Sequence, residues 1–112
     1  MEQKEPLHGK ILNFKNLVEY HSGSIVSKSI IDDKVGRITL FAFDKGEKLS
    51  PHTTPYDALI QIVEGEGEIV IDNTPHLLKE GESIILPKNI MHSVNANQSF
   101  KMLLTLIKSG VF

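Results

Sequence analysis

Histidine is the residue of this chain best suited to chemistry. The 112-residue sequence has five histidines and no cysteine, which excludes disulfides, thiolate metal sites, thiol catalysis and iron–sulfur clusters. His52 and His92 each lie where glycine and proline border a short apolar run, whereas we expect His8, His21 and His76 at the surface. An imidazole binds a divalent metal or transfers a proton near neutral pH. The first candidate site is therefore His52 with His92.

The composition is that of one globular domain. A hydrophobic content of 40% and a charged content of 23% are ordinary for such a protein. The net charge of −2, without any basic run, lacks the positive surface that nucleic-acid binding requires. Residues 1–20 lack the apolar core of a signal peptide, and no apolar stretch approaches the roughly 18 residues of a membrane span. We expect a single cytoplasmic domain over residues 1–112, with no nucleic-acid or membrane partner.

Glycine and proline recur at short intervals and separate short apolar runs. Runs of this kind, rich in Ile, Val, Leu, Thr and Phe, predict β-strands. The sequence predicts eight, over residues 24–31, 35–43, 58–63, 68–72, 76–79, 83–86, 92–95 and 101–108. The segment 72–75 has turn-forming residues and predicts a hairpin between the runs 69–71 and 76–78. An all-β sandwich or barrel follows an N-terminal arm over residues 1–22, in which only 12–20 has any helical character.

Two segments, residues 46–67 and 81–95, resemble the two motifs of the cupin superfamily. The family pattern has Gly, His-x-His, Glu and Gly in the first motif, and Gly, Pro-x-Gly and His in the second. The matching positions of this chain are Gly46, His52, Gly65, Gly81, Pro87 and His92. The resemblance implies a double-stranded β-helix, a small jelly-roll barrel. It also implies a pocket at one end of the barrel, lined by His52, Thr54, Ala58 and His92.

This chain departs from the family pattern at the metal ligands. Thr54 and Ala58 stand where metal-binding cupins have their second histidine and their glutamate. Only His52 and His92 remain, and a metal site normally takes three or four ligands. We therefore expect any divalent ion, such as Zn, Fe, Mn or Ni, to be weakly held. Asp57 could replace the glutamate only if a bulge turned it inward, because adjacent strand residues face opposite sides.

The second motif has one further departure. Asn89 replaces its second glycine. We expect this change to be harmless, because asparagine tolerates the left-handed backbone conformation such a turn needs.

The site residues leave several functions open. One is a metal-free pocket that binds a small molecule through His52, Thr54 and His92. A second is a metal-dependent enzyme, by family resemblance a dioxygenase or isomerase, in which the two histidines hold the ion. A third is a metal-free epimerase or isomerase with one histidine as general base. A fourth is a structural relic. We favour the first, without assigning a catalytic residue, because fold alone does not determine function.

The apolar faces of the strands indicate a partner. In the run 58–63, Leu59 and Val63 share the face opposite Ala58 and would be exposed in a lone barrel. The last run, residues 101–108, is apolar on both faces, which requires cover on both sides. We therefore expect a homodimer, formed by packing of sheet faces or by exchange of N-terminal strands.

Overall fold

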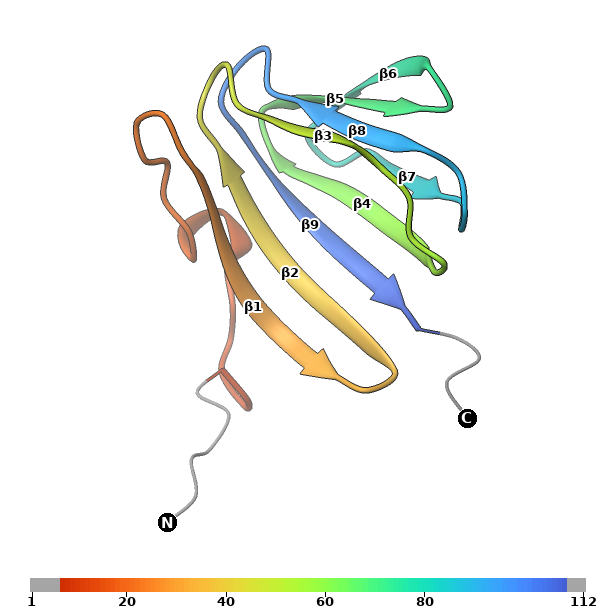
Figure 1. Ribbon diagram of the computed structural model, residues 1–112. Coiled ribbons are helices and arrows are strands. Elements are labelled where there is room, and N and C mark those ends of the chain that lie inside the picture. Colours follow the sequence, from red (N-terminus) through yellow and green to blue (C-terminus); the bar gives the residue numbers. More distant parts are fainter. Residues whose placement is uncertain (1–6, 109–112) are drawn as a thin grey trace.

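The chain forms two antiparallel β-sheets packed face to face (Figure 1). The structure is a computed structural model that describes residues 7–108. Its strands are β1 (Ile25–Asp33), β2 (Gly36–Phe43), β3 (Lys48–His52), β4 (Asp57–Glu64), β5 (Glu66–Ile71), β6 (Thr74–Lys79), β7 (Ser83–Leu86), β8 (His92–Asn95) and β9 (Phe100–Ile107). The larger sheet has the order β1-β2-β9-β4-β7 and the smaller sheet the order β3-β8-β5-β6. This is the predicted all-β jelly roll.

The eight predicted strands are confirmed, each to within about two residues of its ends, and one strand was missed. The missed strand is β3, whose sequence Lys-Leu-Ser-Pro-His has a proline in its interior. Proline cannot donate to a β-ladder and is tolerated at edges and bulges. Strand β3 is the edge of the smaller sheet, and its pairing with β8 shifts between Leu49 and His52.

The predicted hairpin joins β5 to β6 and has a tighter turn than the sequence indicated. Ile71 pairs directly with Thr74, so only Asp72 and Asn73 form the loop. Both have positive φ, 50° and 67°. Two left-handed residues are typical of the two-residue hairpin turn whose twist matches that of the strands.

The core between the sheets is tightest at one end of the barrel, which we call the closed end. Phe43 and Phe100 are completely buried there and stack with ring centroids 4.8 Å apart. Gly67 lies against this stack, and a Cβ at that position would be 2.5 Å from the Phe100 ring. The glycine is therefore required by the close approach of the backbone to an aromatic ring.

The N-terminal arm covers part of the outer face of the larger sheet. Val18 is buried against Leu40, Ala42 and Leu103, and Val63 packs at the edge of the same cluster. The prediction that Val63 is exposed is therefore wrong, because the arm covers it. Residues 12–20 contain a single 3-10 turn, η1 (Phe14–Asn16). No helix in the described part of the chain is long and apolar enough to cross a membrane.

Candidate functional site

A β-bulge brings His52 opposite His92. Leu49 on β3 pairs with Val94 on β8, but the next register pair is His52 with His92, so β3 has one residue more than β8 in this interval. Strict alternation from Leu49 would turn position 52 away from the core. The extra residue returns His52 to the inner face, as bulges beside functional sites commonly do. The structure thus brings together the two histidines that the sequence singled out.

The two imidazoles meet edge to face through their Nε2 atoms. The Nε2 atoms lie 3.1 Å apart, and the ring centroids are 4.3 Å apart at an interplanar angle of 71°. The Nδ1 atom of His52 lies 2.8 Å from the carbonyl oxygen of Ser50, and that of His92 lies 3.2 Å from the carbonyl oxygen of Ile90. Since a carbonyl oxygen only accepts, each Nδ1 donates its hydrogen to the backbone.

This arrangement determines how the pair holds protons. With hydrogen on Nδ1, a neutral imidazole has only an acceptor at Nε2, so two neutral rings cannot form an Nε2–Nε2 hydrogen bond. The bond requires one additional proton, and one ring is then cationic. Burial lowers the pKa of His92, the charge of His52 lowers it further, and the hydrogen bond to Ile90 opposes both. Burial therefore disfavours a positive charge on the His92 ring.

Thr54 and Ala58 stand where the family pattern has two further metal ligands, and neither provides a metal ligand beside the histidine pair. Ala58 is buried in the core cluster and presents only a methyl group. The Thr54 hydroxyl accepts a hydrogen bond from the amide of Tyr56 at 3.4 Å. Asp57 is exposed, and its Oδ1 accepts from the backbone amide of Lys88 at 2.9 Å. No bulge at Asp57 turns it inward, since Asp57 and Ala58 pair in regular register with Ile107 and Leu106.

The residues present do not form the metal site that the fold implies. For two imidazoles on one tetrahedral zinc ion the nitrogen atoms are about 3.3 Å apart, so the 3.1 Å spacing suits two corners of such a site. The remaining corners have no ligand. Within residues 7–108, no three histidine, aspartate or glutamate side chains converge where they could hold a metal ion.

The loop after β7 has the left-handed residue that was expected at Asn89. Asn89 has φ 64°, and its amide donates to the carbonyl oxygen of Thr54 at 2.7 Å. The left-handed conformation that the family pattern assigns to glycine is thus adopted by asparagine, which confirms the prediction.

The inner face of the larger sheet is partly exposed to solvent along the second half of β9. Along β9 the inward residues Phe100 and Met102 are buried, whereas Leu104 and Leu106 are only partly buried. Along β2, Phe43 is buried and Phe41 partly so. We call this end of the barrel the open end. Its wall consists of the half-exposed apolar side chains Phe41, Leu49, Leu104 and Leu106.

The other three histidines lie apart from this pair. His8 and His21 are exposed, as expected. The expectation that His76 is exposed is wrong, because it is half-buried with its Nδ1 atom 3.3 Å from the carbonyl oxygen of Ile69. It shares a face of β6 with the buried Leu78, which explains its burial.

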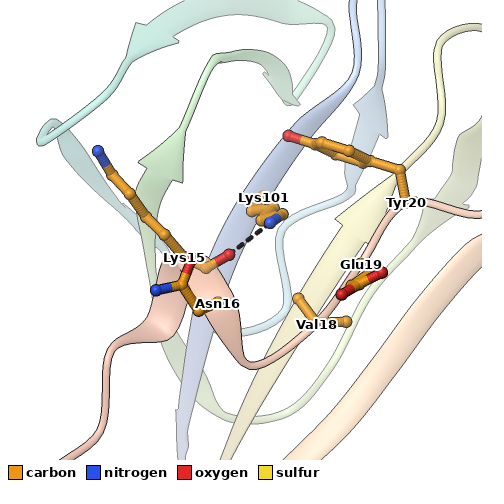
Figure 2. A pocket seen from close by; sticks show the side chains of 6 residues that line it. All are labelled: Lys15, Asn16, Val18, Glu19, Tyr20 and Lys101. Atoms are coloured by element: carbon orange, nitrogen blue, oxygen red, sulfur yellow. Dashed lines mark hydrogen bonds between the residues drawn. The ribbon is translucent and has the colours of Figure 1, made fainter.

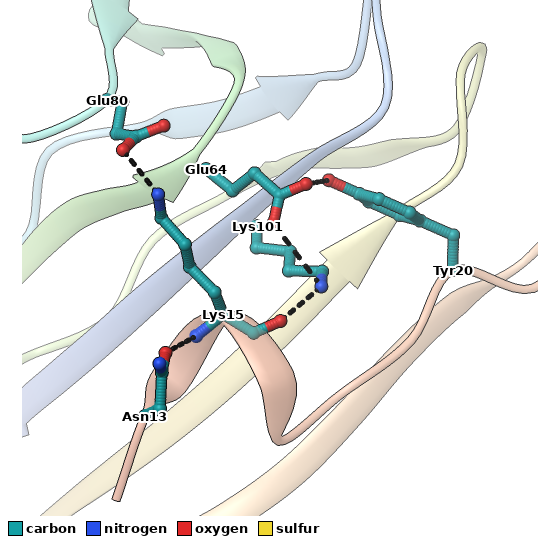
Figure 3. Close-up of polar contacts among 6 residues, drawn as sticks. All are labelled: Asn13, Lys15, Tyr20, Glu64, Glu80 and Lys101. Atoms are coloured by element: carbon teal, nitrogen blue, oxygen red, sulfur yellow. Dashed lines mark hydrogen bonds and ion pairs between the residues drawn. The ribbon is translucent and has the colours of Figure 1, made fainter.

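The sequence reading missed a polar network on the outer face of the larger sheet. The buried Lys101 donates to the carbonyl oxygen of Lys15 and lies 3.5 Å from Glu64, while Tyr20 donates to Glu64 at 3.3 Å (Figure 3). Lys15 pairs in turn with Glu80 at 2.8 Å. The sequence feature that could have indicated this network is Lys101, a charged residue in a predicted strand that is otherwise mostly apolar. Burial, with Glu64 beside it, raises the pKa of Tyr20 to about 12.

A hollow beside this network is lined by arm residues and Lys101 (Figure 2). Lys101 is on the outward face of β9, since Met102 and Leu104 are in the core. The hollow and the histidine pair therefore lie on opposite sides of the larger sheet. Lys101 contacts the N-terminal arm through its hydrogen bond to the carbonyl oxygen of Lys15.

Comparison with known proteins agrees with the fold. Residues 39–107 match the family model described as "Cupin domain". The chain belongs to the cupin family. This match includes both motifs and extends beyond them to β2 and β9.

Proteins of known structure share most of the fold. A conserved protein of unknown function from Streptococcus pyogenes is 33% identical, with a TM-score of 0.86 over 90% of this chain and 89% of that one. A cupin 2 conserved barrel domain protein from Leptotrichia buccalis is 45% identical, with a TM-score of 0.84 over 87% of this chain and 47% of that one. This chain thus spans about half the length of the Leptotrichia protein.

A curated relative matches over a shorter segment. Protein SchB of Streptomyces halstedii is 33% identical over 48 residues, which are 42% of this chain and 35% of that protein. The similarity covers about a third of the relative's length.

Proposed function

We propose that this cupin binds a small molecule at the open end of the barrel without a metal ion. The observation that carries the proposal is the Nε2–Nε2 contact of His52 and His92 at 3.1 Å beside the half-exposed apolar wall. Binding sites commonly combine an apolar lining with a few converging polar groups. His52 and His92 are the polar anchors of the proposed site, and Thr54 and Ala58 complete its lining.

Each feature of the pair suits it to anchor a ligand. The Nδ1 contacts with the carbonyl oxygens of Ser50 and Ile90 fix both rings, so little side-chain entropy is lost on binding. A ligand that takes the place of the Nε2–Nε2 contact can hydrogen-bond to either ring. Ala58 presents only a methyl group where the family pattern has a glutamate.

The test is a fragment screen followed by NMR spectroscopy of ¹⁵N-labelled protein, with and without EDTA. We expect bound fragments to shift the amides of His92 and Leu106, equally in both conditions. His92→Ala abolishes this binding, whereas His21→Ala, a matched change of an exposed arm histidine, leaves it intact. Fragments that bind only when metal is added, or that shift none of these amides, would refute the proposal.

A metal-dependent enzyme with a two-histidine site is the second candidate. It is favoured by the spacing of the Nε2 atoms, which suits two ligands of one ion. If it is correct, purified protein contains close to one metal ion per chain, and His52→Ala and His92→Ala each remove it. Elemental analysis before and after chelation separates this candidate from the first.

We also propose that two copies of the chain associate through the outer face of the larger sheet. The arm covers one part of this face, but Leu59, Ile85 and Ile107 beyond it are 39%, 62% and 53% exposed. Leu59 pairs directly with Ile85 across the β4–β7 ladder, so these side chains form a continuous apolar surface. We expect a dimer by light scattering at micromolar concentration and a shift to monomer in Ile85→Lys. A monomeric wild type would contradict this.

A further inference from the structure

Arg37 is the only arginine of the sequence, and it lies on the inner face of the barrel wall. Along β2, Arg37 shares its face with Phe41 and Phe43, both in the core cluster, whereas Leu40 and Ala42 face the arm. Arg37 is exposed at the end of this face. The arginine therefore borders the open end and does not lie on the outer surface of the sheet.

The strand register places Arg37 in one row with the proposed site. Arg37 pairs with Leu106 on β9, and Leu106 pairs with Ala58 on β4. Directly paired residues share a face, and each strand step is about 4.8 Å. The Cα atoms of Arg37 and Ala58 are thus about 10 Å apart, with Leu106 of the apolar wall between them. A ligand of ordinary size reaches both.

The guanidinium of Arg37 is available to a ligand. Within residues 7–108, its side chain takes part in neither of the two ion pairs and in none of the side-chain hydrogen bonds. The one carboxylate facing it across the ladder is Asp32 on β1, and the two form no ion pair. An arginine presents a planar set of donors that matches a carboxylate in two parallel hydrogen bonds.

We propose that Arg37 anchors the carboxylate of the ligand, so that this cupin selects small organic carboxylates with an apolar body. This inference rests on the proposed function above and adds the class of ligand to it. The carboxylate lies at Arg37, the apolar body along Leu104, Leu106 and Phe41, and the far end toward His52 and His92. The apolar wall would contact the apolar body of the ligand, and Arg37 at the border of the wall would bind its negative charge.

The test compares carboxylates with neutral molecules of nearly the same shape. Benzoate and hexanoate are titrated into ¹⁵N-labelled protein in EDTA, beside benzamide and hexanamide. We expect the two carboxylates to shift the amides of Leu104 and Leu106 and to bind at least about tenfold more tightly than their amides, the size of one charge-assisted hydrogen bond. Arg37→Gln removes this preference, and Arg37→Lys keeps part of it.

Two further variants check that the effect is local. Lys34→Gln removes an exposed cation from the turn between β1 and β2 and leaves the preference unchanged. Asp32→Asn removes the competing carboxylate and tightens carboxylate binding about twofold. The unchanged preference of Lys34→Gln separates a contact at Arg37 from a general effect of net charge, which would weaken carboxylate binding in that variant.

The outcomes distinguish this inference from the proposed function. If acids and amides bind equally at the open end, or if Arg37→Gln keeps the preference, the carboxylate anchor is wrong and the binding site stands. If none of the four probes shifts Leu104 or Leu106, the carboxylate inference is overturned. The fragment screen then decides separately whether the open end binds small molecules at all.

Discussion

At one end of the barrel Phe43 and Phe100 are completely buried and stacked, whereas at the other end Leu104 and Leu106 of the same sheet remain half exposed beside two histidines. The closed end keeps the glycines of the cupin pattern, and Gly67 has no room for a side chain. The open end has lost two of the pattern's metal ligands. The comparison teaches that this chain retains the family's packing constraints at the closed end, whereas two positions of the family's metal-ligand set differ at the open end.

The largest effect is expected from breaking the closed end. Phe100→Ala removes a fully buried ring that stacks on Phe43, and such substitutions cost about 3–5 kcal/mol. We expect this loss in the free energy of unfolding, measured by urea denaturation. Leu106→Ala at the open end serves as the matched change and costs less, because Leu106 is only partly buried. Equal losses would show that the two ends are packed alike.

A smaller effect is expected where the arm meets the larger sheet. Lys101→Met leaves Glu64 without its cation and the Lys15 carbonyl without its donor, at a cost of about 1–3 kcal/mol. We expect the Val18 amide to exchange its hydrogen faster, because the arm is less firmly held. Lys45→Met, at an exposed lysine, is the control and changes stability by less than about 0.5 kcal/mol. Unchanged exchange at Val18 would mean that apolar packing alone holds the arm.

The smallest effect is a pH dependence that the open end alone should show. The pKa of His92 is lower in the folded chain than its ordinary value of 6.5, so the unfolded chain binds more protons near and below that pH. The stability is complete above about pH 6.5 and falls as the pH drops through the folded pKa, with a slope of at most about 1.4 kcal/mol per pH unit.

This dependence is measured by urea denaturation between pH 8 and pH 5. We expect a shallower fall in His92→Gln than in the wild type, and no change in His21→Gln. Identical slopes in the wild type and His92→Gln would contradict the linkage.

The closed end could be predicted from the sequence because its signals are local. Gly46, Gly65 and Gly81 have positive φ, and the apolar runs between glycines and prolines located eight of the nine strands within residues 7–108. Strand β3 was not predicted because Pro51 interrupts the pattern of a strand. The structure accommodates this proline at a bulge. A bulge depends on pairing with a distant strand, so no local propensity reveals it.

The open end could be predicted only in part. Histidine type and spacing identified His52 and His92, but their proton arrangement depends on the carbonyl oxygens of Ser50 and Ile90, which only folded coordinates place. The role of Lys101 was missed because its partners Lys15 and Glu64 are far away in the sequence. The sequence alone did not place Arg37 near the site, because its alignment with Ala58 depends on the strand register.

The most direct test of the central claim, that the open end binds without metal, is a metal titration with an internal positive control. Chelated wild type and Thr54→His/Ala58→Glu, which restores the family's ligand types, are titrated with Mn, Fe, Ni and Zn by calorimetry. We predict no stoichiometric binding by the wild type and about one ion per chain for the double variant. Near-stoichiometric metal in the wild type, lost in His52→Ala and His92→Ala, would contradict the account.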